Sequence, residues 1–202
     1  NIGTLHARGY EAIGRPPLAE TAEGVAAWNQ SLVDNGLPGK FLLSPPKHHD
    51  AFEHGDAVNG VHPGDQLFAR LNLVRAQMIP PVMWTSDVRD FSNYWEAWKG
   101  ETGRRDFADF IDHAADFGCP IQGRAMFVDE AQDLSALEMR LIRRWADSMD
   151  VLTVVGDADQ ALYGWRGADP HVMTQPPIAD EHTIVLPRSR RVPPAVHKAA
   201  LQ

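Results

Sequence analysis

Cysteine, long apolar runs and excess positive charge are all scarce in this sequence of 202 residues. The single cysteine, Cys119, excludes an internal disulfide bond, which suits a reducing compartment, and we expect a cytoplasmic protein. No apolar stretch is long enough to span a bilayer. The formal net charge of -8 argues against a generally basic surface, so a contact with nucleic acid would need a local groove using Arg8, Arg15 and Arg166.

The composition permits a folded core but points to no zinc site. With 44% apolar residues, the chain can bury a core as one domain, or as one domain with an insertion. Four histidines lie close together in the sequence, but their spacing matches no defined ligand pattern and no cysteine accompanies them. These histidines are His48, His49, His54 and His62.

Two acidic residues follow a short apolar run. Residues 125–128 are typical of a buried strand, and Asp129 and Glu130 come directly after it. Open α/β sheets bind ligands at the carboxyl ends of their strands. There, Asp129 could hold Mg²⁺ beside substrate phosphates, and Glu130 could orient or deprotonate an attacking water. The alternative is that the two acids begin a solvated helix, whose first turn favours negative charge.

A second apolar run repeats this pattern. Residues 151–155 predict a parallel strand covered on both faces, and Gly156 and Asp157 end it. The segment between the two runs has a broad apolar helical face, and Ser135 with Glu138 fits a capping box at its start. Strand, helix and strand predict a βαβ unit, with both acidic strand ends at the same edge of one sheet.

Together these two blocks resemble motifs of superfamily 1 DNA helicases of the UvrD/Rep type. Residues 129–133, Asp-Glu-Ala-Gln-Asp, match the family's Walker B motif, and residues 156–169 match its next motif almost position by position. The resemblance implies Mg²⁺ coordination by Asp129, water activation by Glu130 and γ-phosphate sensing by Gln160.

The same resemblance implies a contact with DNA. Tyr163 and Trp165 match aromatic residues that stack on single-stranded bases, and Arg166 matches a basic residue that links the nucleotide and DNA sites. The alternative for the two aromatics is core packing. Their position in a polar turn flanked by glycines favours an exposed platform.

Two shorter matches lie nearer the ends of the sequence. Thr4-Leu5-His6 resembles a Thr-x-His block, which implies that Thr4 and His6 touch the DNA backbone; the alternative is an ordinary surface threonine and histidine. Residues 186–191 stand where the family usually has Leu-x-x-Asn-Tyr-Arg, so Arg191 matches an arginine that contacts the γ-phosphate. The family's Asn and Tyr are replaced here by Ser189 and Arg190, and the alternative is a solvated arginine cluster.

The resemblance implies an α/β fold: part of a RecA-like P-loop NTPase domain with a parallel sheet, carrying an inserted, mainly helical subdomain. We expect residues 1–14 to begin the RecA-like domain, 15–118 to form the insertion and 119–202 to form the ATPase core. The part through about residue 82 is rich in Pro, Gly and His and predicts loops and short helices. Two sets of residues are spaced as packing stripes, and residues 106–110 resemble the helix leading back to the Walker B strand. The stripes are Phe91, Tyr94, Trp95 and Trp98, then Phe107, Phe110, Ile111 and Ala114.

The function implied is an ATP-dependent DNA helicase or translocase of DNA repair or replication, bacterial or phage-encoded. It would use ATP and Mg²⁺ and act on single-stranded DNA and duplex junctions. No Gly-x-x-x-x-Gly-Lys-[Ser/Thr] occurs in these residues. We therefore expect a fragment, completed by a Walker A region and a second RecA-like domain, with negligible ATP hydrolysis alone. The alternatives are a helicase-nuclease, an RNA-directed superfamily 1 member, or a degenerate domain that binds DNA without turnover.

Overall fold

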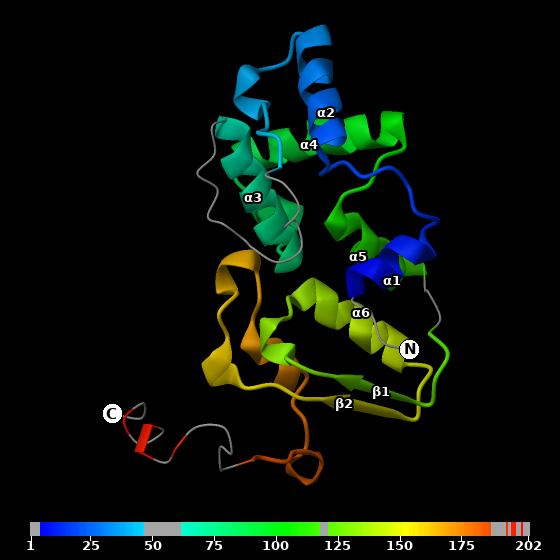
Figure 1. Ribbon diagram of the computed structural model, residues 1–202, viewed down its shortest axis with the longest axis vertical. Coiled ribbons are helices and arrows are strands. Elements are labelled where there is room, and N and C mark those ends of the chain that lie inside the picture. Colours follow the sequence, from blue (N-terminus) through cyan, green and yellow to red (C-terminus); the bar gives the residue numbers. More distant parts are fainter. Residues whose placement is uncertain are drawn as a thin grey trace.

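The computed structural model describes residues 5–46, 62–117 and 121–186, together with positions 193, 195, 196 and 199. Helices α2, α3 and α4 gather at one end of the molecule, and α1, α5, α6 and two strands gather at the other (Figure 1). The helices are α1 (Leu5–Ala12), α2 (Ala22–Asp34), α3 (Pro63–Ala76), α4 (Ser86–Thr102), α5 (Phe107–Phe117) and α6 (Ala136–Ala146), and the strands are β1 (Ala125–Val128) and β2 (Val151–Val154).

Several predicted residues lie outside this described part. They are Thr4, His48, His49, His54, Cys119, Ser189, Arg190 and Arg191. Within the described part, none of the helices combines the length and the apolar character needed to cross a membrane.

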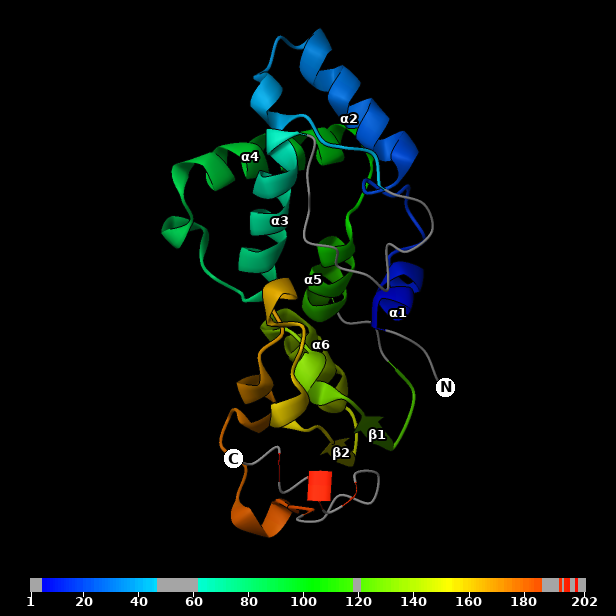
Figure 2. The same ribbon diagram turned by 60° about the vertical axis from the view of Figure 1, so that its left-hand side comes forward.

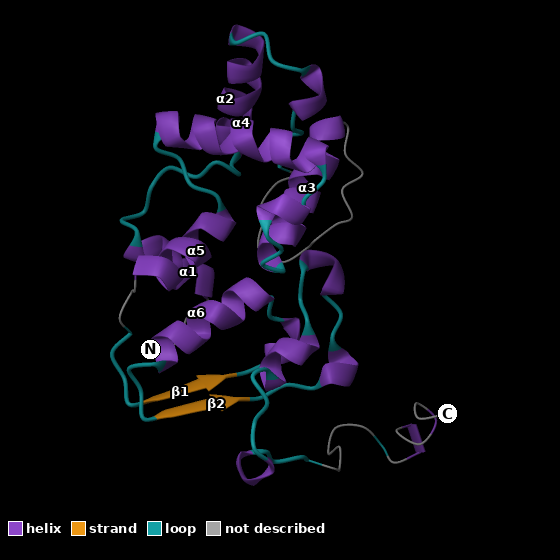
Figure 3. Ribbon diagram, turned by 180° about the vertical axis from the view of Figure 1, so that it is seen from behind, coloured by secondary structure: helices purple, strands orange, loops and turns teal. Residues whose placement is uncertain are grey.

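The predicted strand-helix-strand unit is confirmed. Strands β1 and β2 pair in parallel, from Ala125 opposite Val151 to Val128 opposite Val154, so their carboxyl ends lie side by side. Helix α6 connects them and lies along the sheet (Figure 3). Ser135 and Glu138 form the expected capping box at the start of α6. The chain therefore has an α/β arrangement with a small parallel sheet.

The expectation that both faces of the strands are covered is wrong for the described residues. Met126 and Val128 pack against α6, but Phe127 points to the other face and is 76% exposed. Because successive strand side chains alternate between the two faces, a single helix can cover only one of them. The β-branched run predicted the strand but not what would lie against its second face.

The prediction of loops and short helices up to residue 82 is also wrong in part. Helix α2 has 13 residues and α3 has 14. In α2, Val25, Trp28 and Leu32 occupy one helical face and are buried, and the side chain of Thr21 caps the helix by accepting from Gly24 N–H. These helices persist because their apolar faces pack against other elements, which the local composition does not indicate.

The aromatic stripe on α4 forms the centre of the first hydrophobic core. Phe91, Trp95 and Trp98 are buried, and the Trp28 ring meets the Trp95 ring edge-on with centroids 5.1 Å apart. Tyr94 was predicted to share this face, but it lies at the edge of the stripe and is exposed. Tyr94 comes three residues after Phe91 and one before Trp95. The rotation of the helix between successive residues therefore places its side chain at the edge of the buried face.

A second core fills the other end of the molecule. Residues Phe110, Ile111 and Ala114 of α5 are buried as predicted, and Ile111 and Ala114 pack with Leu141 and Trp145 of α6. Helix α5 thus leads into β1 while packing on the helix that covers the sheet. The domain division at residues 15 and 118 stays a prediction.

A buried charged cluster lies where α3, α4 and α5 meet. The Lys99 ammonium, with its side chain 1% exposed, donates to Asp106 and Asp109 at 2.7 Å, and Arg75 donates to the same two carboxylates. Burial alone would raise the pKa of Asp106, but the charges of Arg75 and Lys99 hold it well below its usual range. The buried Asp106 carboxylate is therefore ionised and is paired with the Lys99 and Arg75 cations.

Candidate functional site

The carboxylates that follow β1 sit on a sharply turned backbone. Glu130 has a φ of 52°, in the left-handed region, and its N–H donates to Asp129 Oδ1 at 3.0 Å. For a residue with a side chain this conformation costs on the order of 1–2 kcal/mol, and such strain concentrates at functional sites. The turn leaves both carboxylates exposed at the carboxyl edge of the sheet.

The two strand ends are tied together beyond the last paired residues. Val155 N–H donates to Val128 O at 2.8 Å, and Ala131 N–H donates to Val155 O at 3.0 Å. The segment after β1 and the segment after β2 are therefore held side by side, as the sequence predicted for the two acidic strand ends.

A buried amide, which the sequence reasoning did not single out, connects these segments. Gln132 is 2% exposed; its Nε2 donates to Glu130 Oε2 at 2.7 Å, and its Oε1 accepts from Asp157 N–H at 3.0 Å. We call the set Glu130, Gln132 and Asp157 the Gln132 bridge. The only sequence signal for it was the position of Gln132 inside the matching block, because both contacts depend on the folded backbone.

The Gln132 bridge reaches Gln160. The Asp157 carboxylate accepts from Asp159 N–H at 3.1 Å and from the side-chain amide of Gln160, while Gln160 N–H donates to Asp157 O at 2.9 Å. The backbone at Gly156 passes so close that a Cβ there would lie 2.7 Å from Gln132 Oε1. The structure thus brings the predicted Glu130 and Gln160 into one hydrogen-bonded chain.

The two aromatic residues of the second block lie on the surface. Tyr163 is 36% exposed and Trp165 is 51% exposed, and the Arg166 guanidinium carbon lies 5.9 Å and 5.8 Å from their ring centroids. Their exposure agrees with a platform rather than with core packing. The role of the three residues in DNA binding stays a prediction.

The turn that carries Tyr163 and Trp165, here called the aromatic turn, packs against the carboxyl end of α3. Gly167 has a φ of 94°, and a Cβ there would lie 2.7 Å from Ala76 Cβ at the end of α3. Figure 2 shows the yellow-orange turn next to that end of α3. A side chain at position 167 would both strain the backbone and collide with α3, so glycine is required here.

His6 lies in α1, close to the start of α6. Its Nδ1 is 4.0 Å from Glu138 Oε1, and its ring meets Phe107 edge-on at 6.0 Å. Burial lowers the pKa of His6, with Glu138 opposing and Arg166 adding to that effect. The predicted contact of His6 with the DNA backbone stays a prediction. Thr4, predicted to share that contact, and Arg191, predicted to contact the γ-phosphate, lie outside the described residues.

The two other arginines proposed for a local groove are engaged with an acid. Arg8 lies 3.6 Å and Arg15 lies 3.2 Å from the carboxylate of Glu11. Both are pairs within or beside α1, at three- and four-residue spacing, and such exposed pairs contribute little to stability.

The donor set at the sheet edge suits a magnesium ion. Mg²⁺ prefers oxygen ligands, and Asp129 and Glu130 present carboxylates where parallel strands end. A second acidic group, Glu96, Asp106 and Asp109, has ligand atoms within 4.8 Å of one another. Lys99 already occupies the space between these carboxylates, so this group reads as a salt-bridge cluster and not as a metal centre.

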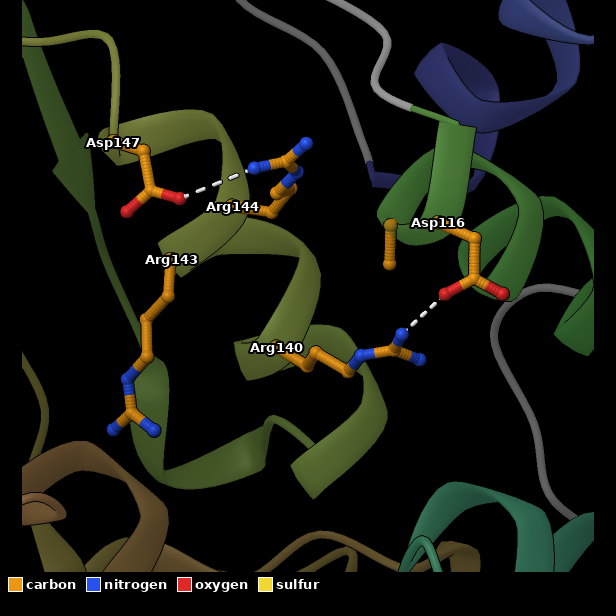
Figure 4. A pocket seen from close by; sticks show the side chains of 6 residues that line it. Asp116, Arg140, Arg143, Arg144 and Asp147 are labelled. Carbon is orange, nitrogen blue, oxygen red and sulfur yellow. Dashed lines mark hydrogen bonds and ion pairs between the residues drawn. The ribbon is translucent and has the colours of Figure 1, made fainter.

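A shallow hollow of about 380 Å³ lies between α5 and α6, and none of the predicted site residues lines it. Figure 4 shows the three α6 arginines that line it, with Arg140 paired to Asp116 and Arg144 paired to Asp147. Arg143 donates instead to Val172 O at 2.7 Å. Since local partners satisfy these guanidinium groups, we assign no ligand to the hollow.

Comparison with known proteins places the matching residues in one segment. Residues 120–177 match the family described as the UvrD/REP helicase N-terminal domain. ATP-dependent DNA helicase UvrD2 of Mycobacterium tuberculosis is 44% identical over 50 residues, which cover 25% of this chain and 7% of that protein. ATP-dependent DNA helicase PcrA of Staphylococcus aureus is 50% identical over 42 residues, which cover 21% of this chain and 6% of that protein.

The matching segment contains β1, α6, β2 and the aromatic turn, and it therefore includes the whole hydrogen-bonded chain from Glu130 to Gln160. The alignments cover only a small share of the relatives' length. Through residues 120–177, this chain carries a UvrD/Rep-like helicase segment.

Proposed function

We propose that this chain is part of the RecA-like ATPase domain of an ATP-dependent DNA helicase or translocase, with a mainly helical insertion. The observation that carries the proposal is the hydrogen-bonded chain from Glu130 to Gln160 at the carboxyl edge of two parallel strands. Ligands bind at this edge in open α/β sheets. The similarity of this segment to UvrD2 and PcrA supports the same assignment.

In the proposed mechanism, water attacks the γ-phosphate of ATP in line with the leaving group. Asp129 would hold Mg²⁺, which would supply charge neutralisation at the phosphates. Glu130 orients the water and accepts its proton, and Gln160 senses the γ-phosphate. Arg191 stabilises the developing charge as a permanently ionised donor. A phosphate-binding loop supplied by other residues of the same polypeptide completes the site.

The proposed DNA platform stands next to this site. Tyr163 and Trp165 stack on single-stranded bases, each contact being worth roughly 1–3 kcal/mol. Thr4 and His6 contact the DNA backbone, and Arg166, over both exposed rings, connects the platform to the nucleotide site. A change at the γ-phosphate would thereby alter the grip on DNA.

The alternative to this proposal is a domain that binds DNA without hydrolysing ATP. The two candidates differ in a single measurable property. A helicase hydrolyses ATP faster when single-stranded DNA is present, whereas a degenerate domain shows no such stimulation.

The test is Glu130→Gln in the full-length protein that contains these residues. We expect DNA-stimulated ATP hydrolysis to fall by roughly 100-fold or more, because the substitution removes a general base, while ATP binding is retained. Steady-state ATPase assays and nucleotide-binding titrations measure the two properties.

Glu101→Gln is the matched control, since Glu101 is an exposed acid on α4, far along the chain from the strand ends. It should leave turnover unchanged. Near-normal turnover in the Glu130→Gln protein would contradict the role assigned to Glu130.

A further inference from the structure

We infer that Gln132 is a positioning residue that sets the location of Glu130 relative to the loop beginning at Asp157, and so couples water activation to the DNA platform. The inference rests on the proposed function and deepens it. It assigns no contact with ATP, metal or DNA to Gln132 itself.

The Gln132 side chain uses both ends of its amide. Its N–H donates to Glu130 Oε2 at 2.7 Å, and its carbonyl oxygen accepts from Asp157 N–H at 3.0 Å. An amide is the side-chain group that can donate to a carboxylate on one side and accept from a backbone N–H on the other. Because Gln132 is almost completely buried, leaving either partner unmatched would be unfavourable.

The surroundings restrict where this amide can go. A Cβ at Gly156 would lie 2.7 Å from Gln132 Oε1 and 3.0 Å from Gln132 N, so the backbone beneath the amide is as close as a glycine allows. Ala131, the preceding residue, is buried and donates to Val155 O. Gln132 therefore lies in a fixed frame formed by the two strand ends.

The contacts define a path between the two proposed functions. Glu130 lies at one end, Asp157 follows Gln132, and the Asp157 carboxylate accepts from the amide of Gln160. The segment that begins at Asp157 continues within a few residues to Tyr163 and Trp165. A displacement of this segment would be transmitted through Gln132 to the carboxylate that orients water.

Two substitutions separate the two hydrogen bonds. Gln132→Met has a similar length and removes both the donor and the acceptor. Gln132→Glu keeps an oxygen for Asp157 N–H but replaces the donor to Glu130 with a second carboxylate, which repels it. Gln66→Met is the matched control, because Gln66 is an exposed glutamine on α3.

Amide hydrogen exchange on the 202-residue chain tests the geometry directly. Gln132→Met should make the Asp157 amide exchange roughly fivefold faster or more, whereas Gln132→Glu should leave it protected. The amides of Ala131 and Val155, held by backbone carbonyls, serve as internal references. An unchanged exchange rate of the Asp157 amide in Gln132→Met would show that Gln132 does not hold the Asp157 N–H, and would overturn the inference.

ATPase and DNA-binding assays on the full-length protein test the coupling. Gln132→Met and Gln132→Glu should both lower the DNA-stimulated kcat by roughly 10- to 100-fold, with the KM for ATP changed less than about threefold, because Glu130 is misplaced and binding is not lost. Both variants should also abolish the change in single-strand affinity caused by a non-hydrolysable ATP analogue, because each breaks the path between Glu130 and Asp157. If Gln132 had a purely structural role, its substitution would weaken the binding of ATP and of single-stranded DNA in parallel. It would not lower kcat while leaving the KM for ATP nearly unchanged.

The outcomes distinguish this inference from the proposed function. A wild-type protein without DNA-stimulated ATPase activity overturns the proposed function and the catalytic part of the inference with it. An active wild-type protein together with unchanged kcat in both Gln132 variants overturns the inference alone. If Gln132→Met does not fold, as judged by circular dichroism, the loss of kcat in folded Gln132→Glu supports the inference and unchanged kcat overturns it.

Discussion

At the scale of single residues, the site depends on backbone positions that few residue types tolerate. Glu130 adopts a left-handed conformation, and Gly156 and Gly167 stand where a Cβ would collide with Gln132 or with α3. These positions aim the carboxylate of Glu130 and hold the aromatic turn against α3. The chemistry of the site is therefore carried by exposed side chains on a tightly constrained backbone.

Replacing Trp165 with alanine tests its role in DNA binding separately from its contribution to stability. Because Trp165 is half exposed, Trp165→Ala should change the free energy of unfolding by no more than about 0.5 kcal/mol. Single-strand affinity should fall by the equivalent of roughly 1–3 kcal/mol through the loss of stacking. Fluorescence anisotropy with labelled single-stranded DNA and urea denaturation measure the two effects.

Tyr94→Ala provides the comparison, since it removes another exposed aromatic ring, on α4, outside the proposed platform. It should leave DNA affinity unchanged. Equal single-strand affinities for wild type and Trp165→Ala would show that Trp165 does not contribute to DNA binding.

At the scale of elements, α6 connects the two strands and covers one face of the sheet. Its capping box combines Glu138 N–H donating to Ser135 Oγ at 3.3 Å with Ser135 N–H donating to Glu138 Oε2 at 2.9 Å. Ser135 also pairs with Ala168, just after the aromatic turn, in an isolated antiparallel β-bridge. The start of α6 is thus joined to the segment just after the aromatic turn.

Ser135→Ala should lower the free energy of unfolding by about 1 kcal/mol, because the first turn of α6 loses its side-chain acceptor. Chemical denaturation followed by circular dichroism measures this change. Ser148→Ala, an exposed serine after the other end of α6, should have a smaller effect. Equal stabilities for the two variants would show that the cap contributes nothing measurable.

At the scale of the whole molecule, the buried charged cluster lies between the core around α4 and the core between α5 and α6. Asp106 precedes α5 and accepts hydrogen bonds from Arg75 on α3 and from Trp95 and Lys99 on α4. The helical end and the sheet-bearing end are thereby connected through one buried carboxylate. Removing a single member of such a cluster leaves buried charge without its partner.

Asp106→Asn should lower the free energy of unfolding at pH 7 by roughly 3–5 kcal/mol. The pKa of Asp106 is held below its usual range by Arg75 and Lys99 against the effect of burial, so its ionised form stabilises the folded state above the unfolded value of about 4. That contribution decreases as the pH falls below this value and is lost as the pH falls through the lowered pKa of the folded state. The difference between wild type and Asp106→Asn should therefore narrow at acidic pH.

Urea denaturation at neutral pH and near pH 3 measures this dependence. Asp116→Asn is the control, since Asp116 pairs with Arg140 on the surface and its loss should cost less than about 1 kcal/mol. If wild type and Asp106→Asn differed in their free energy of unfolding by the same amount at both pH values, the assigned role of Asp106 would be contradicted.

Local patterns in the sequence were sufficient for the strand ends, the capping box and the exposed aromatic turn. Each depends on residues close together in the chain: apolar runs before Asp129 and Asp157, a serine three residues before Glu138, and glycines around Trp165. The structure agrees with all of these. It differs at α2 and α3, whose apolar faces pack on the aromatic stripe of α4.

By itself, the sequence determined which residues carry the acidic and aromatic chemistry of the two matching blocks, because residue type and short spacing are local properties. Only the tertiary structure decided that the described residues leave one face of the strands uncovered, that α2 is a full helix, and that Gln132 joins Glu130 to Asp157. These features depend on contacts between segments tens of residues apart. Such contacts form only when burial of the cores brings the segments together.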